Sequence, residues 1–158
     1  MVKVKLILIG KTKSKFLIEG ENEYQKRLKH YCKFSELIIQ DIKNAGKLSK
    51  KELKEKEGNL ILKSLKNSDY VILLDDKGLT LSSAGFAEFL SKKMVSSASE
   101  LAFIVGGAFG FSESVYKRAN TKLSLSKMTF SHQMVRLIFK EQLYRAFTII
   151  KGEKYHHV

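Results

Sequence analysis

The sequence has no proline, no tryptophan and only one cysteine, Cys32. One thiol cannot form a disulfide within the chain and has no second thiol with which to build a zinc site, so the protein is compatible with a reducing compartment. Apolar runs are far shorter than the roughly 20 residues that cross a bilayer, and residues 1–5 begin a strand-like alternation rather than a signal peptide. We therefore expect a cytoplasmic protein with no membrane segment and no metal site.

Acidic side chains are scarce relative to basic ones. The chain has 29 Lys and Arg against 16 Asp and Glu, which gives a formal net charge of +13. Such an excess indicates a polyanionic partner, and nucleic acid is the first candidate. The alternative is that lysine serves only as solvated surface, because lysines occur in almost every segment. Charge alone does not distinguish RNA from DNA.

Hydrophobic residues make up 44% of the chain and charged residues 28%, which is the balance of a globular protein with a core. Strand patterns cover residues 2–9, 36–42, 70–75, 101–105 and 122–125, and helical patterns cover residues 16–30, 49–66, 82–94, 113–119 and 132–150. Ser49 and Glu52 have the spacing of a capping box at the start of the second helix. Because strands and helices alternate, the sequence predicts an α/β fold, with a mostly parallel sheet and flanking helices. With no linker and no internal repeat, we expect one domain over residues 1–158.

Three segments follow strands at the edge of the predicted sheet where open α/β folds bind small ligands. They cover residues 73–78, 104–110 and 123–130. Gly106 and Gly107 in the second segment would let a ligand approach the backbone closely, since no Cβ stands in the way. The glycines match neither the dinucleotide-binding GxGxxG pattern nor the GxxxxGKS/T phosphate loop, and a glycine pair after a strand is by itself more often a tight turn than a cofactor site.

Polar residues gather at the start of the last predicted helix and along it. His132 would lie in the first turn, where free backbone amides favour negative charge on a ligand. Arg136 lies one turn later. Glu141 and Arg145 are spaced as i,i+4 partners, and a surface ion pair explains these two equally well. The tail, residues 152–157, ends in an aromatic residue and two histidines, too few for a metal site without further ligands.

Seven motifs occur in one order across the whole chain and together resemble a known family. They are Gly10-Lys11, Leu74-Asp75, Val105-Gly106-Gly107, LSLSKMTF at residues 123–130, HQMVR at 132–136, EQLYRA at 141–146, and Tyr155-His156. Each motif alone is unspecific. In register over a chain of this length, they resemble the SPOUT superfamily of RNA methyltransferases, in particular its small stand-alone members that methylate N3 of a pseudouridine in the 23S ribosomal RNA.

This resemblance implies properties that periodicity does not show. It implies a C-terminal trefoil knot, which the rarity of knots would otherwise exclude, and a homodimer in which the partner's C-terminal tail completes each site. The substrate would be 23S rRNA in the large subunit or the whole ribosome. The cofactor would be S-adenosylmethionine, bound by positions that match the family's donor site: Leu74, Gly106, Leu125, Ser126, Lys127, Met128, Thr129 and Phe130.

The resemblance also places catalytic roles on His132, Arg136, Glu141, Arg145, Tyr155 and His156. An imidazole can accept a proton near neutral pH, so His132 is the candidate base for the proton at N3. The arginines would hold a phosphate or a developing oxyanion, and the two tail residues would stack on or fix the displaced base. The chain departs from the family pattern at Ser131 and Lys154, where many members have proline, and at Ala108-Phe109, where many have Pro-Glu.

Two other functions remain open from the sequence alone. A non-catalytic RNA- or ribosome-binding protein would use the same basic surface but would not bind the methyl donor. An α/β enzyme for an anionic metabolite would bind neither RNA nor ribosomes in a salt-sensitive way.

Overall fold

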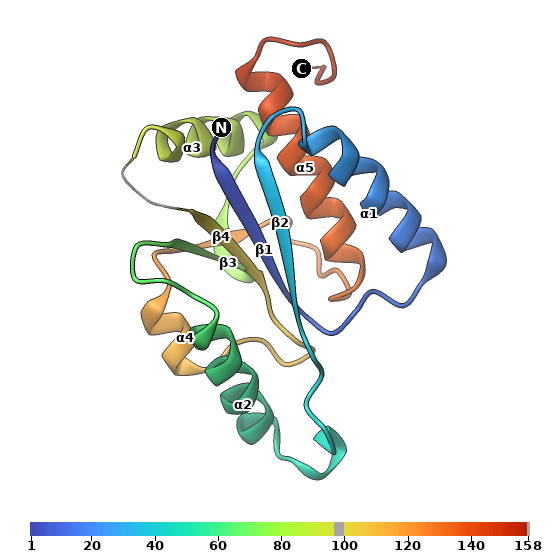
Figure 1. Cartoon of the computed structure of the whole chain (residues 1–158), viewed down its shortest axis with the longest axis vertical. Coiled ribbons are helices and arrows are strands. Elements are labelled where there is room, and N and C mark those ends of the chain that lie inside the picture. The colour runs from blue at the N-terminus through green and yellow to red at the C-terminus, as the bar shows by residue number, and fades with distance from the viewer. Residues whose placement is uncertain (97–99, 158) are drawn as a thin grey trace.

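The computed structural model describes residues 1–96 and 100–157, and its centre is a five-stranded parallel sheet (Figure 1). The strands are β1 (Lys3–Ile9), β2 (Lys33–Ile39), β3 (Tyr70–Thr80), β4 (Leu101–Val105) and β5 (Thr121–Ser124). They lie in the order β2-β1-β4-β3-β5, and every pair is parallel. The α/β fold class and the parallel sheet predicted from the sequence are confirmed.

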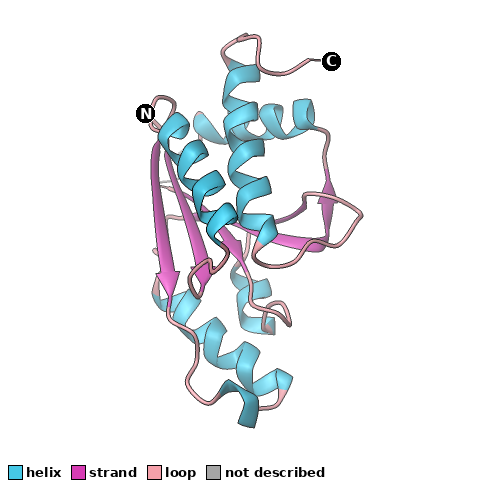
Figure 2. Ribbon diagram, turned by 90° about the vertical axis from the view of Figure 1, so that its right-hand side faces the viewer, coloured by secondary structure: helices cyan, strands magenta, loops and turns pink. Residues whose placement is uncertain are grey.

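Helices cover both faces of the sheet (Figure 2). On one face lie α1 (Lys15–Leu28), α3 (Ser83–Met94) and α5 (Met134–Ile150), and on the other lie α2 (Lys50–Lys63) and α4 (Glu113–Arg118). Within β1, Leu6 and Leu8 belong to the first core and Ile7 to the second, as the alternation of side chains along a strand requires. The central strands are therefore buried on both faces, which explains their continuous apolar runs.

Serine side chains begin three of the helices. Ser49 and Glu52 form the predicted capping box, with Ser49 Oγ accepting from the Glu52 N–H and Glu52 Oε1 accepting from the Ser49 N–H, both at 3.1 Å. Ser82 accepts from the Gly85 N–H, and Ser112 accepts from the Val115 N–H. Each cap satisfies an amide that the first turn of a helix leaves without a partner.

Several element boundaries differ from those that the sequence predicts. β3 continues to Thr80 instead of residue 75, because after a register shift Leu79 and Thr80 pair with β5. β2 is displaced toward the N-terminus, where its whole length pairs with β1. α5 begins at Met134 and not at residue 132, because Ser131 Oγ accepts from the Met134 N–H and the intervening residues form a turn.

The inner side of α5 carries a buried lysine that holds the helix to its neighbours. Lys140 has no exposed surface, and its Nζ lies 2.8 Å from Glu21 on α1 and 2.6 Å from Glu36 on β2. Gln25 Oε1 also accepts from it at 3.1 Å. A buried charge needs such partners, since desolvation is otherwise costly. This network fixes the position of α5 relative to α1 and to β2.

Candidate functional site

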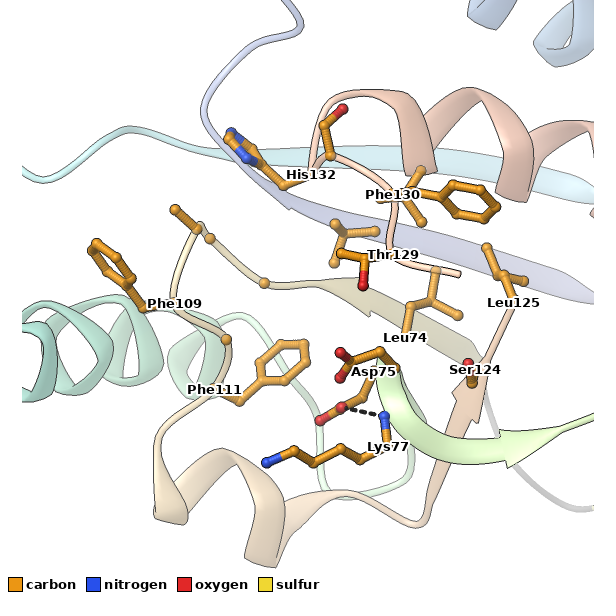
Figure 3. Close-up of a pocket in the computed structure, with 18 of the residues that line it drawn as sticks. Leu74, Asp75, Lys77, Phe109, Phe111, Ser124, Leu125, Thr129, Phe130 and His132 are labelled. Atoms are coloured by element: carbon orange, nitrogen blue, oxygen red, sulfur yellow. Dashed lines mark hydrogen bonds between the residues drawn. The ribbon is translucent and has the colours of Figure 1, made fainter. Parts of the chain in front are cut away.

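A cavity of about 510 Å³ opens beside the middle of β3 and at the carboxyl ends of β4 and β5 (Figure 3). Its walls are the end of the apolar part of β3 with the residues that follow it, the loop after β4, and the segment between β5 and α5. These are the three segments that the sequence predicts as ligand-binding. The parallel sheet brings them together, because all its strands end at the same edge.

The loop after β4 folds into a tight turn. The Gly110 N–H donates to the Gly107 carbonyl at 3.2 Å, and Gly110 has a φ of +85°, which favours glycine. A Cβ on buried Gly106 would lie 3.1 Å from the ring of Phe111. A Cβ on Gly107 would lie 2.8 Å from the carboxylate of Glu57, on α2. The glycines therefore bring the backbone of this loop close to its neighbours while the loop lines the cavity.

Serine side chains shape the segment between β5 and α5. Ser124 Oγ donates to the Ser126 carbonyl at 2.7 Å, and Ser126 Oγ accepts from the Met128 N–H at 2.9 Å. Ser131 then begins the turn into α5. Such bonds between side chain and neighbouring backbone stabilise turns without proline. In this chain, which has no proline, serine thus supports the loop.

Asp75 brings a negative charge to the cavity wall. Its carboxylate accepts from the Tyr116 hydroxyl and, at 2.9 Å, from the Lys77 N–H. Partial burial would raise the pKa of Asp75, but these hydrogen bonds and the charge of Lys122 outweigh it, so the pKa is lowered. Burial and Asp75 in turn raise the pKa of Tyr116. The carboxylate therefore stays ionised at neutral pH and favours a cationic group on a ligand.

Most of the residues predicted to bind the cofactor lie on this cavity. Its lining includes Leu74, Gly106, Leu125, Ser126, Met128, Thr129 and Phe130, whereas Lys127 is exposed and does not line it. His132 lies at the rim with an exposed side chain, near the turn that carries Phe109 (Figure 3). Sequence reasoning did not single out Phe111 or Tyr116, because both are carried by the α4 region and only the fold brings them to the cavity.

Arg136 lies beneath the cavity, fully buried, and is not among the residues that line it. Its guanidinium donates to the carbonyls of Ile9 at 2.7 Å and Gly10 at 2.8 Å, and to Thr12 Oγ1 at 3.1 Å. It also donates to the His132 carbonyl at 3.2 Å. Burial lowers the pKa of Arg136 even though nearby carboxylates oppose the shift. Arg136 thus connects the end of β1 to the start of α5.

The other four predicted catalytic residues meet at the far end of α5. Glu141 Oε1 accepts from Arg145 Nε and from the Tyr155 hydroxyl, both at 3.1 Å. Arg145 Nη1 lies 3.1 Å from His156 Nδ1, and the Tyr155 hydroxyl lies 3.1 Å from that of Tyr24. Burial and these hydrogen bonds raise the pKa of Tyr155. We refer to Glu141, Arg145, Tyr155 and His156 as the tail cluster.

None of the four residues of the tail cluster lines the cavity of its own chain. A helix rises about 1.5 Å per residue, so Arg145 lies roughly 16 Å along the axis from Met134, the first residue of α5. Among residues 1–96 and 100–157, no three His, Cys, Asp or Glu side chains gather as they would around a metal ion. In the same described part of the chain, no helix is long and apolar enough to span a membrane.

Comparison with known proteins identifies the family. A family model described as "Predicted SPOUT methyltransferase" matches residues 2–156. The chain is 55% identical over 156 residues to Ribosomal RNA large subunit methyltransferase H of Parabacteroides distasonis, with 99% of both chains covered. Proteins of the same name from Flavobacterium johnsoniae and Christiangramia forsetii are 57% and 54% identical over 154 residues, with 98% of each chain covered. This chain belongs to the SPOUT methyltransferase family.

Proposed function

We propose that this chain transfers a methyl group from S-adenosylmethionine to N3 of a pseudouridine in the 23S ribosomal RNA, on the assembled ribosome. The observation that carries the proposal is the cavity at the carboxyl edge of the sheet, which is lined by seven of the eight residues that the family resemblance predicts to bind the donor. The relatives named as large-subunit rRNA methyltransferases supply the substrate class. A ribosomal substrate would place the protein in the cytoplasm.

The residues of the cavity fit this methyl donor. A volume of about 510 Å³ lies within the range of roughly 300–1,000 Å³ that small-molecule sites occupy. Leu74, Leu125 and Phe130 offer apolar walls for a purine ring, and Gly106 lines the same cavity. The ionised Asp75 suits the positive charges of the donor. When bound, the donor supplies an electrophilic methyl group, and the protein has to orient it and exclude water.

On the substrate side, a proton must leave N3 of the base as the methyl group arrives. His132 lies on the rim of the cavity with its imidazole exposed, so it can reach a base that enters from solvent. We assign it the role of general base. Arg136 supports this residue indirectly, since its guanidinium holds the His132 carbonyl. We therefore interpret Arg136 as a positioning residue rather than one that contacts the RNA.

We also propose that the protein acts as a homodimer in which the tail cluster of one protomer completes the cavity of the other. The observation that supports this arrangement is that none of the four residues of the tail cluster lines the cavity of its own chain. The internal bonds of the tail cluster already hold Arg145, Tyr155 and His156 in one group. A two-fold axis that relates the two protomers would create two such composite sites in each dimer.

Calorimetric titration with S-adenosylmethionine tests the proposed activity. We expect saturable binding, and tritium transfer from the labelled donor to ribosomes. Gly106→Val should abolish donor binding, because its Cβ alone would come within 3.1 Å of Phe111. Gly46→Val is the matched control, since nothing lies within 4 Å of a Cβ there. Salt-sensitive ribosome binding without donor binding would instead support the non-catalytic RNA-binding alternative.

Mixing two inactive variants tests the composite site. One variant carries Gly106→Val, and the other carries Tyr155→Ala with His156→Ala. When the two variants are mixed in equal amounts and exchange subunits, half of the dimers contain one protomer of each variant. In each of these mixed dimers, the intact tail cluster of one protomer completes the intact cavity of the other. We then expect about a quarter of the wild-type activity to return. If each tail served its own chain, no activity would return, and that result would refute the arrangement.

A further inference from the structure

Phe109 is an exposed aromatic residue at the tip of the turn between Gly107 and Gly110. Its side chain is 46% exposed, and it lies on the rim of the cavity rather than inside it. In Figure 3 its ring lies on the same side of the cavity as His132 and away from Leu125 and Phe130 on the inner wall. An aromatic ring held at the entrance of a site, beside the proposed base, faces whatever substrate enters there.

A lysine from α2 holds one face of this ring. Lys50 Nζ lies 5.1 Å from the centroid of the Phe109 ring, within the range of a cation–π contact. Lys50 is the first residue of α2, and Lys47 and Lys51 beside it are also exposed. Glu52 lies among them, but its carboxylate is engaged in the capping box with Ser49. Several lysines therefore lie beside Phe109, and 46% of the Phe109 side chain stays exposed for another partner.

We propose that Phe109 is a stacking platform for an unpaired RNA base next to the nucleotide that enters the cavity, and that Lys50 binds the adjoining phosphate. This inference rests on the proposed function, because it concerns how the same site recognises RNA. Single-stranded RNA is bound where an aromatic face takes a base and a nearby cation takes the backbone. The ring of Phe109 and the ammonium group of Lys50 supply these two elements, and they are in contact with each other.

Steady-state kinetics with purified ribosomes as substrate test the platform. Phe109→Ala should raise KM for ribosomes between about fivefold and 150-fold, the range measured for the loss of one base–aromatic stack. The contact is present before and during the reaction, so kcat should stay within about twofold. Phe109→Trp should retain the wild-type KM. Phe109→Leu is the matched control, because it keeps an apolar side chain but removes the aromatic face.

Three results would overturn the platform. They are a KM unchanged by Phe109→Ala, a Phe109→Leu variant as good as wild type, and a loss of S-adenosylmethionine affinity in calorimetry that parallels the rise in KM. The last would make Phe109 a wall of the donor site. Lys50→Ala should reduce the salt dependence of ribosome binding, whereas Lys92→Ala, which removes an exposed lysine on α3, should not.

The platform and the proposed function can fail separately. If wild-type protein transfers no methyl group to ribosomes, the proposed function fails. The platform is then tested by binding alone, comparing the ribosome affinity of wild type and Phe109→Ala on filters. Equal affinities there would refute the platform as well, and weaker binding by the variant would support it.

Discussion

Replacement of Arg136 by methionine separates a positioning role from direct contact with the substrate. The sequence predicts that Arg136 binds RNA, whereas the structure shows its guanidinium fully buried and bonded to the backbone of two segments. Methionine fills much of the same volume and removes all the donors. If Arg136 connects β1 to α5, the main effect of Arg136→Met is on stability. If it contacts the substrate, the main effect is on methyl transfer.

The expected loss of stability follows from the bonds. The two shortest, to Ile9 O at 2.7 Å and Gly10 O at 2.8 Å, are buried and charge-assisted. Bonds of this kind contribute about 1.5–3 kcal/mol each, so their loss costs roughly 3–6 kcal/mol. Removing the charge also removes its desolvation cost, which is the cause of the lowered pKa of Arg136. We therefore expect a net loss of about 3 kcal/mol and a fall in Tm of roughly 6–12 °C.

Urea denaturation followed by circular dichroism measures this change. Arg136→Lys, which keeps the charge but presents fewer donors, should lie between methionine and wild type. Arg27→Met is the control at a surface arginine, because Arg27 forms a partly exposed ion pair with Glu23 and lies over the rings of Tyr24 and Tyr144, which together should contribute only about 1 kcal/mol. The reasoning is refuted if Arg136→Met is as stable as Arg27→Met and still fails to methylate ribosomes.

Three further predictions concern buried groups outside the cavity. Lys140→Met should lower the free energy of unfolding by about 3 kcal/mol, because it leaves the buried carboxylate of Glu21 and the partly buried one of Glu36 uncompensated; changing Glu21 and Glu36 to glutamine as well should recover much of the loss in the same urea assay. Burial raises the pKa of Glu57, so the carboxyl group of Glu57 stays protonated to a higher pH in the folded protein than in the unfolded chain. The folded state therefore loses stability as the pH rises through the pKa that Glu57 has in the folded protein. Glu57→Gln should therefore raise Tm at pH 8 but not at pH 4, and equal gains at both pH values would contradict this. Burial also raises the pKa of Cys32 to about 12, so a thiol reagent at pH 8 should label it only in denaturant, and rapid labelling of the native protein would count against its place in the core.

Much of the fold can be predicted from local patterns. The predicted and observed bounds of an element differ where pairing between distant segments determines them. The alternation in β1 and the capping box at Ser49 act within a few residues, so they are visible in the sequence. The extension of β3 to Thr80 depends on a register shift opposite Leu123. Its residues after position 75 are mostly polar or glycine, and no local pattern marks them as a strand. The order of the strands is likewise set by packing, which periodicity does not reveal.

The candidate site is predictable in part, for a related reason. Segments that end parallel strands meet at one edge, so the donor residues could be grouped from the fold class and the family resemblance together. The residues at the start of α5 and along it could not be grouped in this way, because side chains that are close in the sequence can lie in different parts of the structure. His132 faces solvent at the cavity, Arg136 faces the core, and Arg145 belongs to the tail cluster. The residues that the family resemblance treats as one catalytic set therefore lie in three places: at the cavity, in the core and in the tail cluster. This division supports the proposed homodimer, because a tail cluster supplied by a partner would bring both groups of residues to one substrate.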